Sequence, residues 1–217
     1  MTHIRKQHID YTLYLVTDRS VMSAKSLEQA VEQAIQGGCT VVQLREKQVS
    51  SREFFETAQK VKQITDSHHI PLIINDRTDI CLAVNAAGIH VGQQDLPAKV
   101  VRSIVGPDKI IGVSAATLSE AIQAEQDGAD YLGVGAMFAT STKTNTRPVT
   151  IEQLTQIKQA VQIPVVAIGG IQSSNVTTLT NTGIDGIAVV SAILAQENIT
   201  HAAEQVETYF TGVGHEF

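Results

Sequence analysis

Pro71-Leu-Ile-Ile-Asn-Asp76 is a short apolar run that ends abruptly in polar residues, and Gly88-Ile-His-Val-Gly-Gln-Gln-Asp95 repeats this pattern a little further on. The segment between them, residues 77–87, is predicted to be a short helix. Two parallel strands joined by one crossover helix lie side by side, about 4.8 Å apart. We therefore expect Asp76 and Asp95 at the same ends of neighbouring strands, close enough to share one hard cation. The alternative is that each aspartate merely caps the helix that follows it.

Similar apolar runs recur along the whole chain. Eight β-branched-rich runs alternate with segments of helical periodicity, at residues 13–17, 40–44, 72–74, 89–91, 110–113, 131–134, 165–168 and 186–190. Strands that are apolar throughout belong to sheets that are covered on both faces. Strict alternation of strand and helix, repeated eight times, predicts a parallel sheet closed on itself, a (β/α)8 TIM barrel.

An open doubly wound sheet is the second candidate for the fold. That fold normally carries its glycine-rich turn after the first strand. Here the first run continues into Thr17-Asp18-Arg19-Ser20, and the glycine pair follows the seventh run instead. No linker or second-domain boundary is visible. We expect a polar tail over residues 1–10, followed by a single compact barrel domain over residues 11–217.

Composition argues against several classes of partner. The 217 residues carry a formal net charge of −6, which does not favour nucleic acid or an anionic membrane surface as the main partner. The two cysteines lack metal-ligand spacing, residues 1–10 do not resemble a secretion signal, and no apolar run reaches the ~20 residues of a membrane span. We expect a cytoplasmic protein with free thiols. The sequence leaves the oligomeric state open, a homo-oligomer included.

The second run ends in a cluster of polar side chains. Side chains alternate between the faces of a strand, so Gln43, Arg45 and Lys47 share one face while Val42 and Leu44 share the other. The apolar pair suits the helix-facing side, which directs the polar set to the mouth of the barrel. Two cations beside the strand that bears Asp76 suit a polyanion held with a metal. The alternative is a solvated strand end.

Three other polar residues near the mouth are ambiguous. Ser114 ends the fifth run, where a serine is usually a helix cap, and no histidine or aspartate at a telling spacing marks it as a nucleophile. A single histidine in a strand, such as His90, is more often a satisfied core or rim residue than a metal ligand. Asn75 faces away from Asp76 unless the strand has begun to turn.

The later runs lead into candidate phosphate sites. A long, hydroxyl-rich loop over residues 136–148 carries Lys143, and loops of this length are often binding loops. Gly169-Gly170 and Val190-Ser191 follow the seventh and eighth runs, where this fold frequently binds phosphate through backbone N–H groups. A surface loop and a tight turn are the ordinary alternatives. Two anion sites indicate two phosphorylated substrates, or one with phosphate at both ends.

The motifs, taken in order, resemble those of the thiamine-phosphate synthase family. The resemblance rests on residues 14–18, 43–47, 74–76, 88–95, 112–114, 140–143, 168–171 and 190–191. It implies a (β/α)8 barrel that joins a hydroxymethylpyrimidine diphosphate to a thiazole phosphate and releases pyrophosphate, with Mg²⁺ as the cofactor and two phosphorylated small molecules as substrates. Stabilisation of the leaving group would then drive the reaction.

The resemblance also implies a role for each matching residue. The Mg²⁺ ligands would be Asp76 and Asp95. The pyrimidine diphosphate would contact Gln43, Arg45, Lys47, Asn75, Ser114 and Lys143, among which Arg45, Lys47 and Lys143 would act in catalysis. The thiazole phosphate would contact Thr140, Ser141, Thr142, Gly170, Val190 and Ser191.

Two alternatives to a synthase remain open at this point. A related branch of the barrel isomerises the thiazole moiety, and it lacks the motif formed by Thr140, Thr142 and Lys143. A non-catalytic sensor of a phosphorylated thiazole or thiamine intermediate would have no need for a metal-held diphosphate site, which Asp76 and Asp95 indicate.

Overall fold

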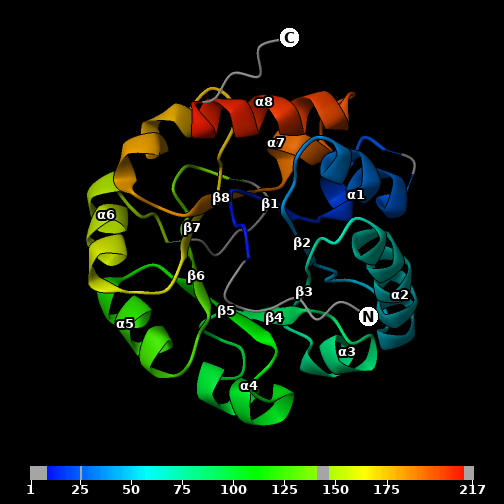
Figure 1. Ribbon diagram of the computed structural model, residues 1–217, viewed down its shortest axis with the longest axis horizontal. Coiled ribbons are helices and arrows are strands. Elements are labelled where there is room, and N and C mark those ends of the chain that lie inside the picture. Colours follow the sequence, from blue (N-terminus) through cyan, green and yellow to red (C-terminus); the bar gives the residue numbers. More distant parts are fainter. Residues whose placement is uncertain (1–8, 25, 141–146, 213–217) are drawn as a thin grey trace.

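The structure, a computed structural model, describes residues 9–24, 26–140 and 147–212. Within these ranges, eight parallel strands close into a barrel, and the first strand pairs with the last (Figure 1). The strands are β1 (Leu13–Val16), β2 (Val41–Leu44), β3 (Leu72–Asn75), β4 (Gly88–Val91), β5 (Ile110–Ala115), β6 (Tyr131–Val134), β7 (Val165–Ile168) and β8 (Gly186–Val189). All eight predicted runs therefore form strands.

Helices surround the barrel as an outer ring (Figure 1). They are α1 (Leu27–Gln36), α2 (Ser51–Ser67), α3 (Thr78–Ala83), α4 (Ala98–Val105), α5 (Leu118–Gln126), α6 (Ile151–Ala160), α7 (Ser191–Leu194) and α8 (Ile199–Thr211), with 3₁₀ helices η2 (Arg19–Val21) and η3 (Val176–Thr182). This arrangement confirms the predicted (β/α)8 barrel and excludes the open sheet. The boundary expected between residues 10 and 11 stays a prediction.

The strands are apolar throughout because both of their faces are buried. In β1, Leu13 and Leu15 join the large core between strands and helices, whereas Tyr14 and Val16 belong to a smaller cluster inside the barrel. The same alternation in β2 turns Gln43 inward, where the side chain is only 4% exposed. Inward-facing positions near the carboxyl ends of the strands therefore line the mouth of the barrel.

Two connections differ from the sequence prediction. The helix expected after the seventh strand is the 3₁₀ helix η3. Its sequence is rich in threonine, a β-branched residue that favours an α-helix only weakly. The helix expected over residues 77–87 is shorter, spanning only α3. None of the helices in the described ranges is long and apolar enough to cross a membrane.

Candidate active site

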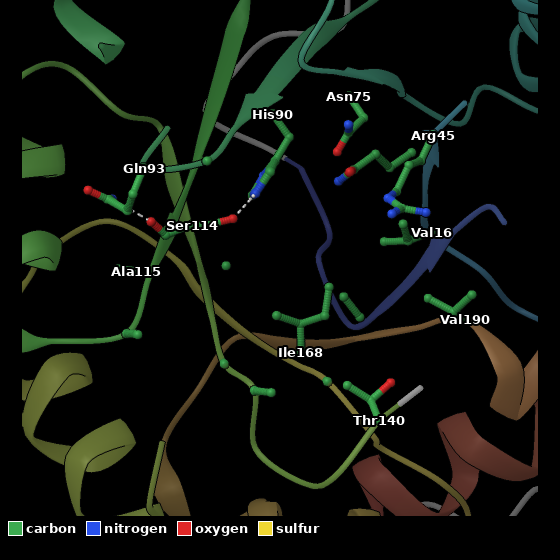
Figure 2. Close-up of a pocket in the computed structure, with 18 of the residues that line it drawn as sticks. Val16, Arg45, Asn75, His90, Gln93, Ser114, Ala115, Thr140, Ile168 and Val190 are labelled. Atoms are coloured by element: carbon green, nitrogen blue, oxygen red, sulfur yellow. Dashed lines mark hydrogen bonds between the residues drawn. The ribbon is translucent and has the colours of Figure 1, made fainter. Parts of the chain in front are cut away.

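A cavity of about 710 Å³ opens at the carboxyl ends of the strands. It brings together every predicted site residue that the structure describes: Gln43, Arg45, Lys47, Asn75, Asp76, Asp95, Ser114, Thr140, Gly170, Val190 and Ser191. Figure 2 shows Arg45 and Asn75 on one side of this cavity, and Thr140 and Val190 on another. Ser141, Thr142 and Lys143 lie outside the described residues.

Arg45 is held in place by the end of the neighbouring strand. Its Nη1 donates to Oδ2 of Asp18 over 2.8 Å, and both side chains are largely buried, 19% and 12% exposed. The backbone N–H of Arg45 also donates to the hydroxyl of Thr17 over 2.9 Å. Asp18 thus holds the guanidinium and Thr17 holds the backbone of Arg45. The sequence prediction did not name Asp18 as a neighbour of Arg45.

The two aspartates lie close together beside Lys47. Asp76 has a positive φ of 61°, so the strand has ended there and Asn75 can also reach the cavity. Lys47 Nζ lies 2.5 Å from Asp76 Oδ2, and Asp95 accepts the N–H of Gly92 over 2.7 Å. Burial raises the pKa of Asp95, the negative charge of Asp76 raises it further, and the Gly92 N–H opposes both. A second carboxylate beside Asp95 that makes its charged form less favourable suits a site for a cation.

The floor of the cavity is a line of hydrogen-bonded side chains. Ser114 Oγ lies 2.9 Å from His90 Nε2 (Figure 2), and His90 Nδ1 lies 2.9 Å from the hydroxyl of Tyr131. The Tyr131 hydroxyl is 2.7 Å from that of Tyr14, which accepts from Gln43 Nε2 over 2.9 Å. His90 is a satisfied residue near the mouth, as expected, but its bond to Ser114 was not predicted.

The Ser114–His90 pair does not have the surroundings of a hydrolytic serine. A histidine that activates a serine is oriented by a carboxylate that stabilises the imidazolium. The second nitrogen of His90 faces the phenol of Tyr131 instead. Burial raises the pKa of Tyr131 well above its usual value, so this phenol stays neutral. The pair is therefore suited to hold a ligand and not to attack it.

The opposite rim is built from backbone at the ends of β7 and β8. Gly169 and Gly170 both have positive φ, 99° and 66°, and a Cβ on Gly170 would lie 2.7 Å from the carbonyl oxygen of Phe138. Only glycine fits this close approach of two chain segments. Gln172 Nε2 donates to the Ser191 hydroxyl over 3.0 Å and so joins the two strand ends.

An ion pair closes the side of the cavity at β5 and β6. Arg147 donates to both carboxylate oxygens of Glu120, over 2.7 and 2.8 Å. The Arg147 pair holds the pKa of Glu120 below its usual value. Glu120 also accepts the N–H of Ala116 over 2.8 Å, so one carboxylate fixes the loop after β5 and the end of the long loop after β6.

The charges around the cavity are balanced among the residues described. Each of the lining cations there, Arg45, Lys47 and Arg147, already faces a carboxylate. No group of three or more histidine, cysteine, aspartate or glutamate side chains in those ranges is arranged to hold a metal. Mg²⁺, however, is commonly bound by one or two carboxylates together with waters and substrate phosphates. Asp76 and Asp95 fit that pattern, and a bound diphosphate would need the added positive charge.

This mouth belongs to the class of (β/α)8-barrel enzymes that act on phosphorylated small molecules. A family model described as "Thiamine monophosphate synthase" matches residues 13–193. The thiamine-phosphate synthase of Ruminiclostridium cellulolyticum is 62% identical over 205 residues, covering 94% of this chain and 98% of its own length. That of Clostridium beijerinckii is 56% identical over the same shares.

A solved structure gives the same result. Thiamine phosphate pyrophosphorylase from Pyrococcus furiosus superposes with a TM-score of 0.86 at 38% identity, over 94% of this chain and 97% of that one. The chain belongs to the thiamine-phosphate synthase family, whose members are transferases.

Proposed function

We propose that this chain joins 4-amino-2-methyl-5-hydroxymethylpyrimidine diphosphate to 4-methyl-5-(2-phosphooxyethyl)thiazole, giving thiamine phosphate and pyrophosphate. Family membership supports the coupling reaction. The observation that carries the proposal is the cluster of Lys47, Asp76 and Asp95 on one rim of a cavity whose other rim is glycine backbone. A diphosphate and a monophosphate would each have a rim of their own.

The pyrimidine diphosphate is assigned to the rim at β2 to β5. Arg45 and Lys47 would bind the diphosphate oxygens, with Lys143 approaching from the loop after β6, and Asp76 and Asp95 would hold Mg²⁺. Once bound, Mg²⁺ supplies positive charge for the diphosphate. Gln43, Asn75 and Ser114 would hold the substrate from the floor and side of the cavity, where all three lie.

The thiazole phosphate is assigned to the rim at β7 and β8. Gly170, Val190 and Ser191 lie at this rim, and backbone N–H groups at the ends of β7 and β8 are a common phosphate site in this fold. Thr140, Ser141 and Thr142 would add hydroxyl groups from the loop after β6. This assignment leaves the centre of the cavity for the two reacting rings.

The reaction requires loss of pyrophosphate before or during attack. The bond between the exocyclic carbon and the diphosphate oxygen breaks, and both electrons leave with the oxygen. The electron-rich aminopyrimidine supports the positive charge left on that carbon, and the thiazole nitrogen donates its lone pair to it. Arg45 and Lys47 stabilise the leaving charge, and no general base is required.

The test is release of pyrophosphate with both substrates and Mg²⁺ present. We expect release to require both substrates, to stop with EDTA and to return with excess Mg²⁺. Asp76→Asn should raise the Mg²⁺ concentration needed for half-maximal rate. A sensor would bind one ligand and release no pyrophosphate, and a tautomerase would convert the thiazole alone; either result would refute the synthase proposal.

A cytoplasmic location is part of the same proposal. Cys39 and Cys81 are buried and unbridged, which suits a reducing compartment. Burial raises the pKa of Cys81 to about 11, so its thiol is not reactive.

A further inference from the structure

The buried side chains beneath the cavity connect two of its walls. Gln43 comes from β2 and Ser114 from β5, and Tyr14, Tyr131 and His90 link them through successive contacts of 2.7–2.9 Å. Both ends line the cavity, as does His90. The two tyrosines are at most 1% exposed and His90 is 9% exposed, so water has little access to these bonds.

The barrel has made room for this line of side chains. Strand register places His90 opposite Gly112, and Gly112 opposite Tyr131. A Cβ on Gly112 would overlap the phenol of Tyr131, and a Cβ on Gly133 would lie 3.0 Å from Cε1 of His90. Gly112 therefore leaves room for the phenol to cross β5, and Gly133 leaves room for the imidazole that the phenol meets.

We propose that these five side chains form a hydrogen-bond chain with one direction, which presents an acceptor to the ligand at Gln43 and a donor at Ser114. Tyr14, Tyr131 and His90 are its positioning residues. The inference rests on the proposed function for the identity of the ligand.

The direction follows from the number of protons that each group can give. Gln43 Nε2 donates to Tyr14. A hydroxyl has a single proton, so Tyr14 gives its proton to Tyr131, and Tyr131 gives its own to His90 Nδ1. His90 then carries its proton on Nε2 and donates it to Ser114 Oγ. The Ser114 proton remains for the ligand, and so does the carbonyl oxygen of Gln43.

The two ends select the polarity of a ring that lies between them. An aminopyrimidine has an amino group that donates and a bare ring nitrogen that accepts, which matches Gln43 and Ser114. A pyrimidinone presents a carbonyl oxygen and a ring N–H, which is the opposite polarity. A site that leaves its own buried polar groups unpaired with the wrong ligand discriminates strongly. We expect the amino compound to bind at least about a hundredfold more tightly than the oxo compound.

Nitrogen NMR of histidine-labelled protein tests the direction without any variant. Bare and protonated imidazole nitrogens resonate far apart. We expect His90 Nδ1 to be bare and Nε2 to carry the proton. The reverse pattern would mean that the Gln43 amide is turned around and that Ser114 is only an acceptor, and it would overturn the proposal.

Binding of the two pyrimidine diphosphates tests the consequence. Tyr131→Phe and Tyr14→Phe should each narrow the preference for the amino over the oxo compound by about tenfold, because Ser114 is no longer held as a donor. Tyr11→Phe is the matched control: its ring centroid lies 4.9 Å from that of Tyr131, but its hydroxyl is not a member of the chain. The Tyr11→Phe variant should prefer the amino compound as strongly as the unmodified protein does.

The outcomes separate this inference from the proposed function. If the Tyr11, Tyr14 and Tyr131 variants all preferred the amino over the oxo compound to the same degree, the proposed hydrogen-bond chain would be refuted. This would hold even if the enzyme coupled its substrates normally. If the unmodified protein bound neither pyrimidine diphosphate, the proposed function would fail. The NMR pattern of His90, and its change in Tyr131→Phe, would then still decide whether the chain exists.

Discussion

Lys47 and Lys62 form two lysine–aspartate pairs with the same separation, 2.5 Å between Nζ and Oδ2, in different surroundings. Lys47 faces Asp76 at the rim of the cavity and is 49% exposed. Lys62 faces Asp66 one turn further along α2, away from the cavity lining, and the two side chains are 21% and 57% exposed. Ion pairs exposed to this extent contribute about 0.2–1 kcal/mol to stability. Neither pair should matter much for folding.

Replacing each lysine by methionine separates stability from catalysis. For a chain of 217 residues, a loss of 1 kcal/mol lowers the melting temperature by about 2–4 °C, so both variants should stay within that range. Loss of a group that stabilises a leaving charge costs about 10²–10³ in turnover. Lys47→Met should therefore lose that factor in pyrophosphate release, and Lys62→Met should keep normal turnover.

Circular dichroism melts and steady-state pyrophosphate release measure the two effects on the same samples. The reasoning would be refuted if folded Lys47→Met turned over within about threefold of the unmodified protein. It would also fail if Lys62→Met were equally impaired, because the loss would then belong to lysine–aspartate pairs in general and not to the cavity.

Three further changes test other parts of the site. Asp18→Asn removes the ionic partner of Arg45, so the KM for the pyrimidine diphosphate should rise about tenfold, as steady-state kinetics would show. Gly135→Ala would put a Cβ into a backbone carbonyl at the end of β7, and urea unfolding should show a loss of about 1–3 kcal/mol. Glu120→Gln removes a carboxylate whose pKa Arg147 holds below its usual value. Since such a group stabilises the fold above its unfolded pKa and loses that effect as pH falls through its folded pKa, the stability difference from the unmodified protein should be present at pH 7 and vanish in acid.

The sequence was sufficient to predict the fold because the alternation of apolar runs and helical segments repeats eight times. Eight apolar runs with helical segments between them are compatible with few architectures, and each run is a strand in the structure. The rim residues were predictable for a related reason: Arg45, Asp76 and Asp95 follow strands, and the carboxyl ends of parallel strands meet at one mouth.

The floor of the cavity was not predictable from local pattern. Tyr14 and Tyr131 are 117 residues apart, and His90 and Ser114 are 24 apart. Their meeting depends on the closure of the barrel, on the register of β4 to β6 and on the missing side chain at Gly112. His90, Gly112 and Tyr131 lie on three successive strands, and no short stretch of sequence shows that they are neighbours. The 3₁₀ geometry of η3 was not predicted either, although its threonine-rich sequence is consistent with it.

Substitutions at the rim and in the floor of the cavity should affect different steps of the reaction. Charge at the rim acts on the diphosphate, whose negative charge grows as it leaves, so Lys47 should affect turnover. The hydrogen-bond chain in the floor acts on the ring. As the ring takes up positive charge, its amino group becomes a stronger donor and its ring nitrogen a weaker acceptor, so a gain at Gln43 offsets a loss at Ser114. Loss of the hydrogen-bond chain should therefore change binding and ring selectivity far more than kcat. A Tyr131→Phe enzyme that kept its selectivity but lost its turnover would contradict this division.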